Sequence, residues 1–173
     1  MSKSNVETMK RDEMKVLDVL RQHAKDSISE LGKRSDLSPQ KVARIIKNLE
    51  KKKIIWGYSA ITSPDEKSSY YTLLLKRSTV SLDDSMKREV IVEKLDDFLP
   101  SGIKIENIFI THGGWDAIVT FYAPNLVTAK KVVGNLFQRT GKYFNENLLL
   151  ENLFPIRKQG IKNPQIKDLV DYI

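Results

Sequence analysis

Hydrophobic positions in the first third of the chain recur with helical spacing in three segments. The first, residues 12–23, predicts a short core helix, and the second, residues 28–35, predicts another. The second helix is preceded by Ser27 and contains Glu30, which together fit a capping box. The third segment, residues 38–53, has one apolar stripe at i, i+3, i+4 and i+7, formed by Val42, Ile45, Ile46 and Leu49.

The third helix is expected to begin at Ser38, an N-cap residue, with Pro39 in its first turn. A turn of three residues, 36–38, separates it from the short helix before it. A short helix, a tight turn and a longer basic helix predict a helix-turn-helix, with the second helix of the pair placed for the major groove. Residues 54–61 are rich in β-branched and aromatic side chains and predict the strand pair of a small wing.

The pattern changes after a polar stretch at residues 63–69, which is interpreted as a linker. The remaining pattern predicts strands at 70–76, 103–111, 115–121 and 147–154, and helices at 85–99 and 126–140. The order β-α-β-β-α-β is that of the ferredoxin-like fold. The expected class is therefore α+β, with a winged helix-turn-helix domain at 1–62, a ferredoxin-like domain at 70–154 and a tail at 155–173 that contains a short helix.

The net charge of +7 is concentrated in the N-terminal third. Residues 1–62 contain 14 Lys or Arg and 8 Asp or Glu, whereas residues 63–173 contain 15 and 14. Within the first third, residues 38–53 alone contain six basic residues and one acidic residue. This distribution indicates a module that binds a polyanion, joined to a domain of balanced charge.

Composition excludes several other classes of protein. The chain has no cysteine and only two histidines, so disulfides, thiolate zinc sites and a cysteine nucleophile are excluded, and no metal or other cofactor is expected. No apolar run approaches the ~20 residues that cross a bilayer, and the N-terminus lacks the apolar core of a secretion signal. We therefore expect a cytoplasmic protein without a membrane partner and without enzymatic activity.

The polar face of the third helix holds the residues that we expect to contact double-stranded DNA. Arg can read guanine and Gln can read adenine in the major groove, whereas Lys more often binds phosphates. A solvated basic face is the alternative for any one of these side chains. The predicted contact residues are Ser38, Gln40, Lys41, Arg44, Lys47 and Lys51, with Lys33 and Arg34 of the preceding helix reaching the backbone.

The order of domains resembles that of the leucine-responsive regulatory protein (Lrp/AsnC) family of transcriptional regulators. The resemblance covers about residues 12–154 and is carried by local sequences at 28–31, 42–46, 54–58 and 113–116. Lys53 stands where the family usually has Gly, so either a longer third helix or a strained turn is expected there. The tail beyond Pro155 extends past the usual end of the family.

The resemblance implies a homodimer formed through the sheet, with an octamer as a further possibility, and a small-molecule effector such as an amino acid. It places the effector site at the turn formed by Gly113, Gly114, Trp115 and Asp116. Backbone N–H groups of the glycines could bind a carboxylate and Asp116 an ammonium group. The alternative is that the glycines only make the hairpin turn and Asp116 caps it.

Two other functions fit parts of the pattern. An architectural DNA-binding protein with weak sequence preference is compatible with the N-terminal charge, and weak discrimination between DNA sequences would distinguish it. Sirohaem decarboxylases resemble the family in architecture, but they would need His and Arg residues around a tetrapyrrole. The C-terminal part of this chain has only one histidine, His112, and few arginines, so a regulator is the preferred interpretation.

Overall fold

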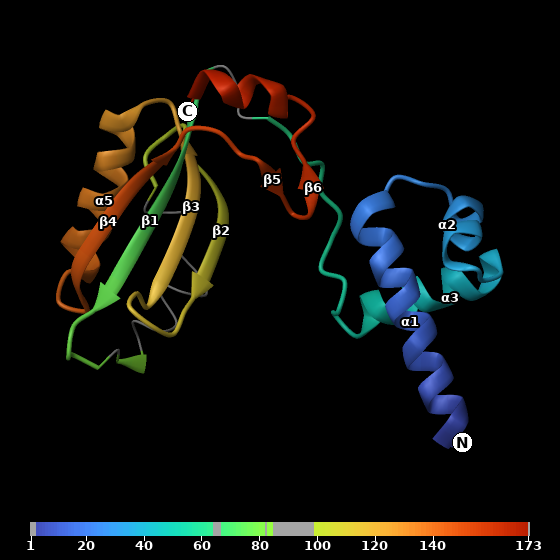
Figure 1. Cartoon of the computed structure of the whole chain (residues 1–173). Helices are drawn as coiled ribbons and strands as arrows, with labels where there is room; N and C mark the ends of the chain where they lie inside the picture. Colours follow the sequence, from blue (N-terminus) through green and yellow to red (C-terminus); the bar gives the residue numbers. More distant parts are fainter. Residues whose placement is uncertain (1–2, 64–66, 82, 85–98, 173) are drawn as a thin grey trace. The chain divides into compact units, whose positions relative to one another are not determined.

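The computed structural model describes residues 3–63, 67–81, 83–84 and 99–172. The chain folds into two compact units. The first unit consists of residues 1–61 and 156–166, and the second of residues 62–155 and 167–173. The C-terminal tail is therefore shared between the two units. Figure 1 shows the three N-terminal helices as one group and the sheet as another.

Three helices form the core of the first unit: α1 (Lys3–His23), α2 (Ile28–Ser35) and α3 (Pro39–Lys51). The bounds of α2 agree with the sequence pattern, whereas α1 begins at Lys3, before the predicted start at residue 12. The three apolar stripes meet in one buried cluster. Its members are Val16, Leu20, Leu31, Val42, Ile45 and Leu49.

The ends of α2 and α3 follow the predicted capping chemistry. Ser27 and Glu30 form a complete capping box at the start of α2, and Ser38 Oγ accepts a hydrogen bond from the Lys41 N–H at the start of α3. Gly32 is required in α2 because a Cβ there would lie 2.9 Å from the Leu37 carbonyl oxygen. These contacts fix the short turn that positions α3 against α2.

The predicted wing strands at residues 54–61 are not formed in the structure. Residues 56–63 form no helix or strand, and they have no ladder partner in the described part of the chain. Two side-chain bonds hold this segment beside the end of α3. Trp56 Nε1 donates to the Lys53 carbonyl at 2.8 Å, and the Tyr58 hydroxyl donates to Glu50 Oε1 at 2.9 Å. High β propensity alone did not produce a hairpin here, because strand pairing depends on side-chain packing as well as on intrinsic preference, and an isolated hairpin is marginally stable.

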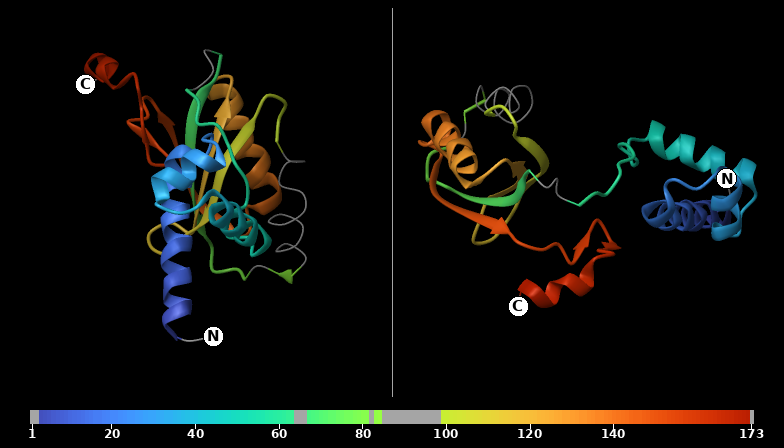
Figure 2. Two further views of the ribbon diagram at one scale, coloured as in Figure 1. Left: turned by 90° about the vertical axis from the view of Figure 1, so that its right-hand side faces the viewer. Right: turned by 90° about the horizontal axis from the view of Figure 1, so that it is seen from above.

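The second unit contains a four-stranded antiparallel sheet in the order β2-β3-β1-β4. Its strands are β1 (Ser69–Arg77), β2 (Lys104–Ile110), β3 (Ala117–Ala123) and β4 (Phe144–Asn152). The helix α5 (Leu126–Thr140) lies along one face of this sheet, as Figure 2 shows from two further directions. The helix predicted at 85–99 falls almost entirely outside the described residues. The strand order and the position of α5 agree with the expected α+β class and ferredoxin-like sheet.

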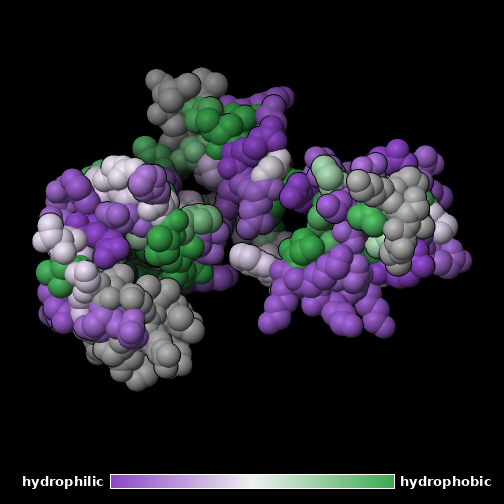
Figure 3. Space-filling view, turned by 90° about the horizontal axis from the view of Figure 1, so that it is seen from below, coloured by the Kyte–Doolittle hydropathy of each residue, from purple (hydrophilic) through white to green (hydrophobic). Residues whose placement is uncertain are grey.

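One face of the sheet forms the core of the second unit. The other face, here named the open face, exposes apolar side chains. Tyr71, Leu73 and Phe121 are buried on the face that α5 covers. Strand side chains alternate between faces, so the residues next to these positions along each strand, together with their cross-strand partners, belong to the other face. That face carries Leu74, Phe109, Ile118, Leu148 and Leu150, of which Phe109, Leu148 and Leu150 are exposed. The hydrophobic areas on the surface of the sheet unit can be seen in Figure 3.

The tail forms more structure than the short helix predicted for it. A two-stranded hairpin, β5 (Arg157–Lys158) and β6 (Ile161–Lys162), precedes a 3-10 helix at Ile166–Tyr172. The hairpin belongs to the first unit together with α1, α2 and α3. Two-residue strands are too short to leave a periodic pattern, which is why the sequence did not indicate them.

Candidate nucleic-acid interface

The outward face of α3 carries four polar side chains in one stripe. Gln40, Arg44, Lys47 and Lys51 follow at i, i+4, i+7 and i+11, so they lie on one side of the helix. All four are exposed, and none has a side-chain hydrogen bond or ion pair with another described residue. This stripe lies opposite the buried residues Val42, Ile45 and Leu49, because α3 packs its apolar side on α1 and α2. The stripe is therefore free to contact a ligand.

A second polar row on α3 is occupied by carboxylates of α1. The Lys41 ammonium lies 2.6 Å from Asp12 Oδ2, and Asp12 is almost fully buried. At the next residue of α1, Glu13 Oε1 accepts from Asn48 Nδ2 at 3.1 Å and from Lys52 Nζ at 3.0 Å. Lys41, Asn48 and Lys52 lie along one flank of α3, beside the free stripe. Lys41 thus holds α3 to α1 through an ion pair, which the sequence could not indicate.

The surroundings of Asp12 favour the charged form of its carboxyl group. Lys41 lowers the pKa of Asp12, chiefly through its hydrogen-bonding contact, and this outweighs the burial that would raise that pKa. Arg11 and Lys15 of α1 add to the lowering. No other donor reaches Asp12 Oδ2 within the described residues. Asp12 is therefore a buried carboxylate that depends on one lysine, and that lysine belongs to the helix with the free stripe.

The two basic residues predicted on α2 differ in their environment. Arg34 Nε donates to Asp26 Oδ2 at 2.7 Å, and this bond directs the guanidinium toward the turn before α2. Lys33 is exposed and has no ion-pair partner in the described parts of the chain. Ser38 is exposed, but its hydroxyl is engaged as the N-cap of α3. Of the eight predicted contacts, five are therefore free side chains, namely Lys33, Gln40, Arg44, Lys47 and Lys51.

The end of α3 contains the strained turn that was one of the two alternatives for Lys53. The helix ends at Lys51, and Lys53 adopts a φ of 54°. The Ile54 N–H donates to the Leu49 carbonyl, and the Lys53 N–H donates to the Glu50 carbonyl. This pattern is a Schellman motif, which usually has Gly at the position of Lys53. The turn directs residues 54–61 back along the helical bundle.

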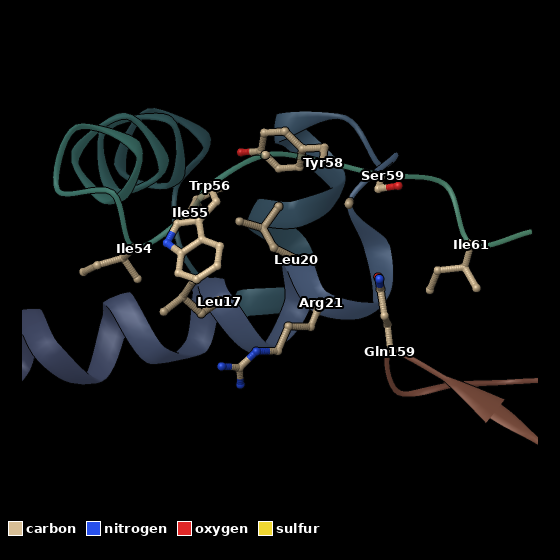
Figure 4. Close-up of a pocket in the computed structure, with 12 residues that line it drawn as sticks. Leu17, Leu20, Arg21, Ile54, Ile55, Trp56, Tyr58, Ser59, Ile61 and Gln159 are labelled. Atoms are coloured by element: carbon tan, nitrogen blue, oxygen red, sulfur yellow. The ribbon is translucent and has the colours of Figure 1, made fainter. Parts of the chain in front are cut away.

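A pocket of about 420 Å³ lies between α1 and the segment that follows α3 (Figure 4). Leu17, Leu20 and Arg21 of α1 line one side of it. Trp56 lines another side and is 91% exposed, and Gln159 reaches the pocket from the turn of the β5–β6 hairpin. The hairpin therefore lies beside the segment where a winged helix-turn-helix has its wing. No feature of the sequence pattern indicated this position for residues 157–162.

The turn predicted to bind an effector is held by a hydrogen bond within it and by one from β1. Asp116 Oδ2 accepts from the Arg77 N–H at 2.8 Å, and the Thr111 hydroxyl donates to the Trp115 carbonyl at 2.6 Å. Gly113 has a φ of 142°, which favours glycine, and Gly114 is exposed with open space around it. The Asp116 carboxylate thus links the turn to the end of β1.

Comparison with known proteins agrees with this description of the first unit. Residues 13–55 match the family model described as winged helix-turn-helix DNA-binding. That range contains about half of α1, all of α2 and α3, and Lys53. No curated protein matches the chain at a significant level of sequence similarity.

Solved structures similar to this chain include several transcriptional regulators. An AsnC family regulator from Agrobacterium tumefaciens has a TM-score of 0.65 and 15% identity, covering 94% of this chain and 98% of its own. A regulator from Neisseria meningitidis in complex with L-Met has a TM-score of 0.64 and 17% identity, with coverage of 90% and 97%. A feast or famine regulatory protein from Mycobacterium tuberculosis, complexed with L-methionine, has 0.63 and 16%, with coverage of 84% and 92%. The chain therefore has the Lrp/AsnC fold.

Proposed function

We propose that this chain is a sequence-specific DNA-binding transcriptional regulator of the Lrp/AsnC type. The observation that carries the proposal is the free stripe of Gln40, Arg44, Lys47 and Lys51 on the outward face of α3. A helix of 13 residues, capped at Ser38 and held on two other helices, presents this stripe as a rigid surface. The mixture of one Arg, one Gln and two Lys suits both base-edge and phosphate contacts.

Selection from a pool of random-sequence duplexes at near-physiological salt tests the proposal. We expect enrichment of a palindrome, because a symmetric oligomer presents two α3 helices to half-sites about 34 Å apart or a multiple of that distance. Tight binding without enrichment would instead identify an architectural protein with weak sequence preference. Absence of binding would contradict the DNA-binding function itself.

We further propose that the regulator is a homodimer whose subunits meet through the open face of the sheet. Phe109, Leu148 and Leu150 expose apolar surface there, on a face that α5 does not cover. Contiguous apolar surface of this kind marks interaction sites in soluble proteins. Hydrogen-bonded polar pairs lie on the same face, such as Asn107 Nδ2 with Thr120 Oγ1 at 2.9 Å. Such pairs favour one register over others when two copies of the face meet.

An amino-acid effector at residues 113–116 is proposed on two grounds. Two structures of similar fold contain L-methionine, and the exposed glycines of the turn have space beside them. Calorimetric titration with L-methionine and other amino acids tests this site. Asp116→Asn keeps an oxygen that can accept from the Arg77 N–H but removes the charge that would bind an ammonium group. Binding of an amino acid to the unmodified chain and its loss in Asp116→Asn would support the site. Absence of binding to both proteins would contradict the proposed effector site.

A further inference from the structure

The β5–β6 hairpin is a short, strongly basic element. Arg157 lies opposite Lys162 and Lys158 opposite Ile161, with Gln159 and Gly160 at the turn. Both turn residues have positive φ, 45° for Gln159 and 85° for Gly160, as a tight two-residue hairpin requires. The Arg157 guanidinium donates to the Gly160 carbonyl, and the Asn163 N–H donates to the Ile156 carbonyl at 3.0 Å. These bonds hold the hairpin together although each of its strands has only two residues.

At the two outer positions of this hairpin, residues of like charge lie opposite each other. Arg157 and Lys162 are direct cross-strand partners, and both are exposed. Like charges directly opposite each other on a strand pair are destabilising. No Asp or Glu occurs between Glu151 and Asp168 in the sequence, and neither Arg157 nor Lys162 has an ion pair within the described residues. The repulsion is therefore not balanced by any acidic side chain within the described residues, and a bound anion would relieve it.

The hairpin belongs to the unit that contains α3. It is grouped with residues 1–61, and Gln159 lines the pocket together with Leu20, Ser59 and Ile61 (Figure 4). Residues 59–61 belong to the segment that follows α3, which forms no strand of its own. The unit therefore has a basic hairpin beside the position of the missing wing, supplied by the opposite end of the chain.

We propose that the β5–β6 hairpin serves as the wing of the DNA-binding unit, and that Arg157 and Lys162 contact phosphates of duplex DNA beside the site bound by α3. Phosphate oxygens supply the negative charge that the opposed pair lacks. Contacts of this kind give affinity and position but no sequence preference. The inference rests on the proposed DNA-binding function and extends its interface to a tail that was outside the predicted contact set.

The test is the salt dependence of DNA binding by the full chain and by the double variant Arg157→Gln/Lys162→Gln. Each phosphate contact contributes about 0.9 to the slope of log K against log salt concentration. We expect the slope of the double variant to be smaller by about two per DNA-bound subunit. The enriched sequence should stay the same, because α3 is unchanged.

Two matched variants separate a local contact from other effects. Lys130→Gln/Lys131→Gln removes the same charge from the exposed side of α5 in the other unit and should leave the slope unchanged. Arg157→Lys loses the guanidinium donor to Gly160 but keeps the charge, so a retained slope would show that charge, rather than the hairpin bond, carries the effect. Thermal unfolding of each variant verifies that it is folded.

The outcomes distinguish this inference from the proposed function. If the unmodified chain binds DNA and the hairpin variant has the same slope, the hairpin is not a DNA contact and the regulator proposal remains. An equal decrease of the slope in the hairpin and α5 variants would show that net charge, rather than a local contact, causes the change, and would overturn the inference. Failure of the unmodified chain to bind any duplex would overturn both.

Discussion

At the scale of single residues, the unit with α3 depends on a carboxylate that is almost entirely removed from water. Asp12 is 3% exposed and faces the Lys41 ammonium at 2.6 Å. Replacing Asp12 removes an ion pair whose carboxylate is shielded from water, and such a pair contributes more than a fully exposed one. The contact also connects α1 directly to the helix proposed to bind DNA.

Asp12→Asn is expected to lower the free energy of unfolding by about 1–3 kcal/mol. Chemical denaturation at pH 7 measures this difference. Glu7→Gln, on the exposed side of α1, is the matched control and should change the free energy by less than about 0.5 kcal/mol.

The Asp12–Lys41 pair should also make stability depend on pH in the acid range. The folded state holds the pKa of Asp12 below its ordinary value of about 3.9, so the pair stabilises the protein fully above that value. This contribution is lost as the pH falls through the lowered pKa. Denaturation curves between pH 7 and 2 should show a smaller decrease for Asp12→Asn than for the unmodified chain. Parallel curves for the two proteins would contradict the assignment.

Lys53 is strained because it has a left-handed conformation that costs an L-residue roughly 1–2 kcal/mol. Lys53→Gly should therefore raise the free energy of unfolding, by up to about 1 kcal/mol after the greater entropy of unfolded glycine is subtracted. Thermal unfolding measures the gain. Lys52→Gly, at the neighbouring residue with a φ of −76°, should destabilise instead. A loss of stability in Lys53→Gly would mean that the Lys53 side chain contributes more than the strain costs.

At the scale of elements, the bounds of α2, α3 and α5 were largely readable from the sequence, whereas the start of α1 and the partners of the polar side chains were not. The apolar repeats of 28–35 and 126–140, and the capping box of 28–35, identified these helices because caps and stripes are local features. Lys41 and Arg34 looked identical to free basic residues, since Asp12 and Asp26 reach them only after folding. Asp12 was missed for the same reason, although an acidic residue on the apolar side of a helix was an available signal.

Arg44→Ala on the free stripe of α3 should cost about 1–3 kcal/mol of binding free energy and relax the preference at one base pair. Binding to the selected duplex and to its single-base variants measures both effects. Lys130→Ala on α5 is the control and should bind all duplexes as the unmodified chain does. Uniform weakening across every duplex would make Arg44 a phosphate contact instead.

At the scale of the whole molecule, the open face of the sheet determines the expected oligomer. Leu150→Glu would place an uncompensated charge within the proposed subunit contact and should raise the dimer dissociation constant about 100-fold or more. Light scattering across a concentration series measures the dissociation constant. Leu153→Glu changes a more exposed leucine just beyond the end of β4 and should leave the dimer intact. Equal dissociation in both variants would show that general surface charge is responsible.

The return of residues 156–166 to the first unit has a consequence for how the protein responds to proteolysis. The main chain passes from one unit to the other at three places, near residues 61, 155 and 166. A protease that cuts within 63–69 severs only one of these connections. The two fragments should therefore migrate together in native gels and separate only in denaturant, as long as Gln159 and its hairpin stay beside residues 59–61. A protein of this topology would keep its two units together after a break that separates the units of a protein with a single linker.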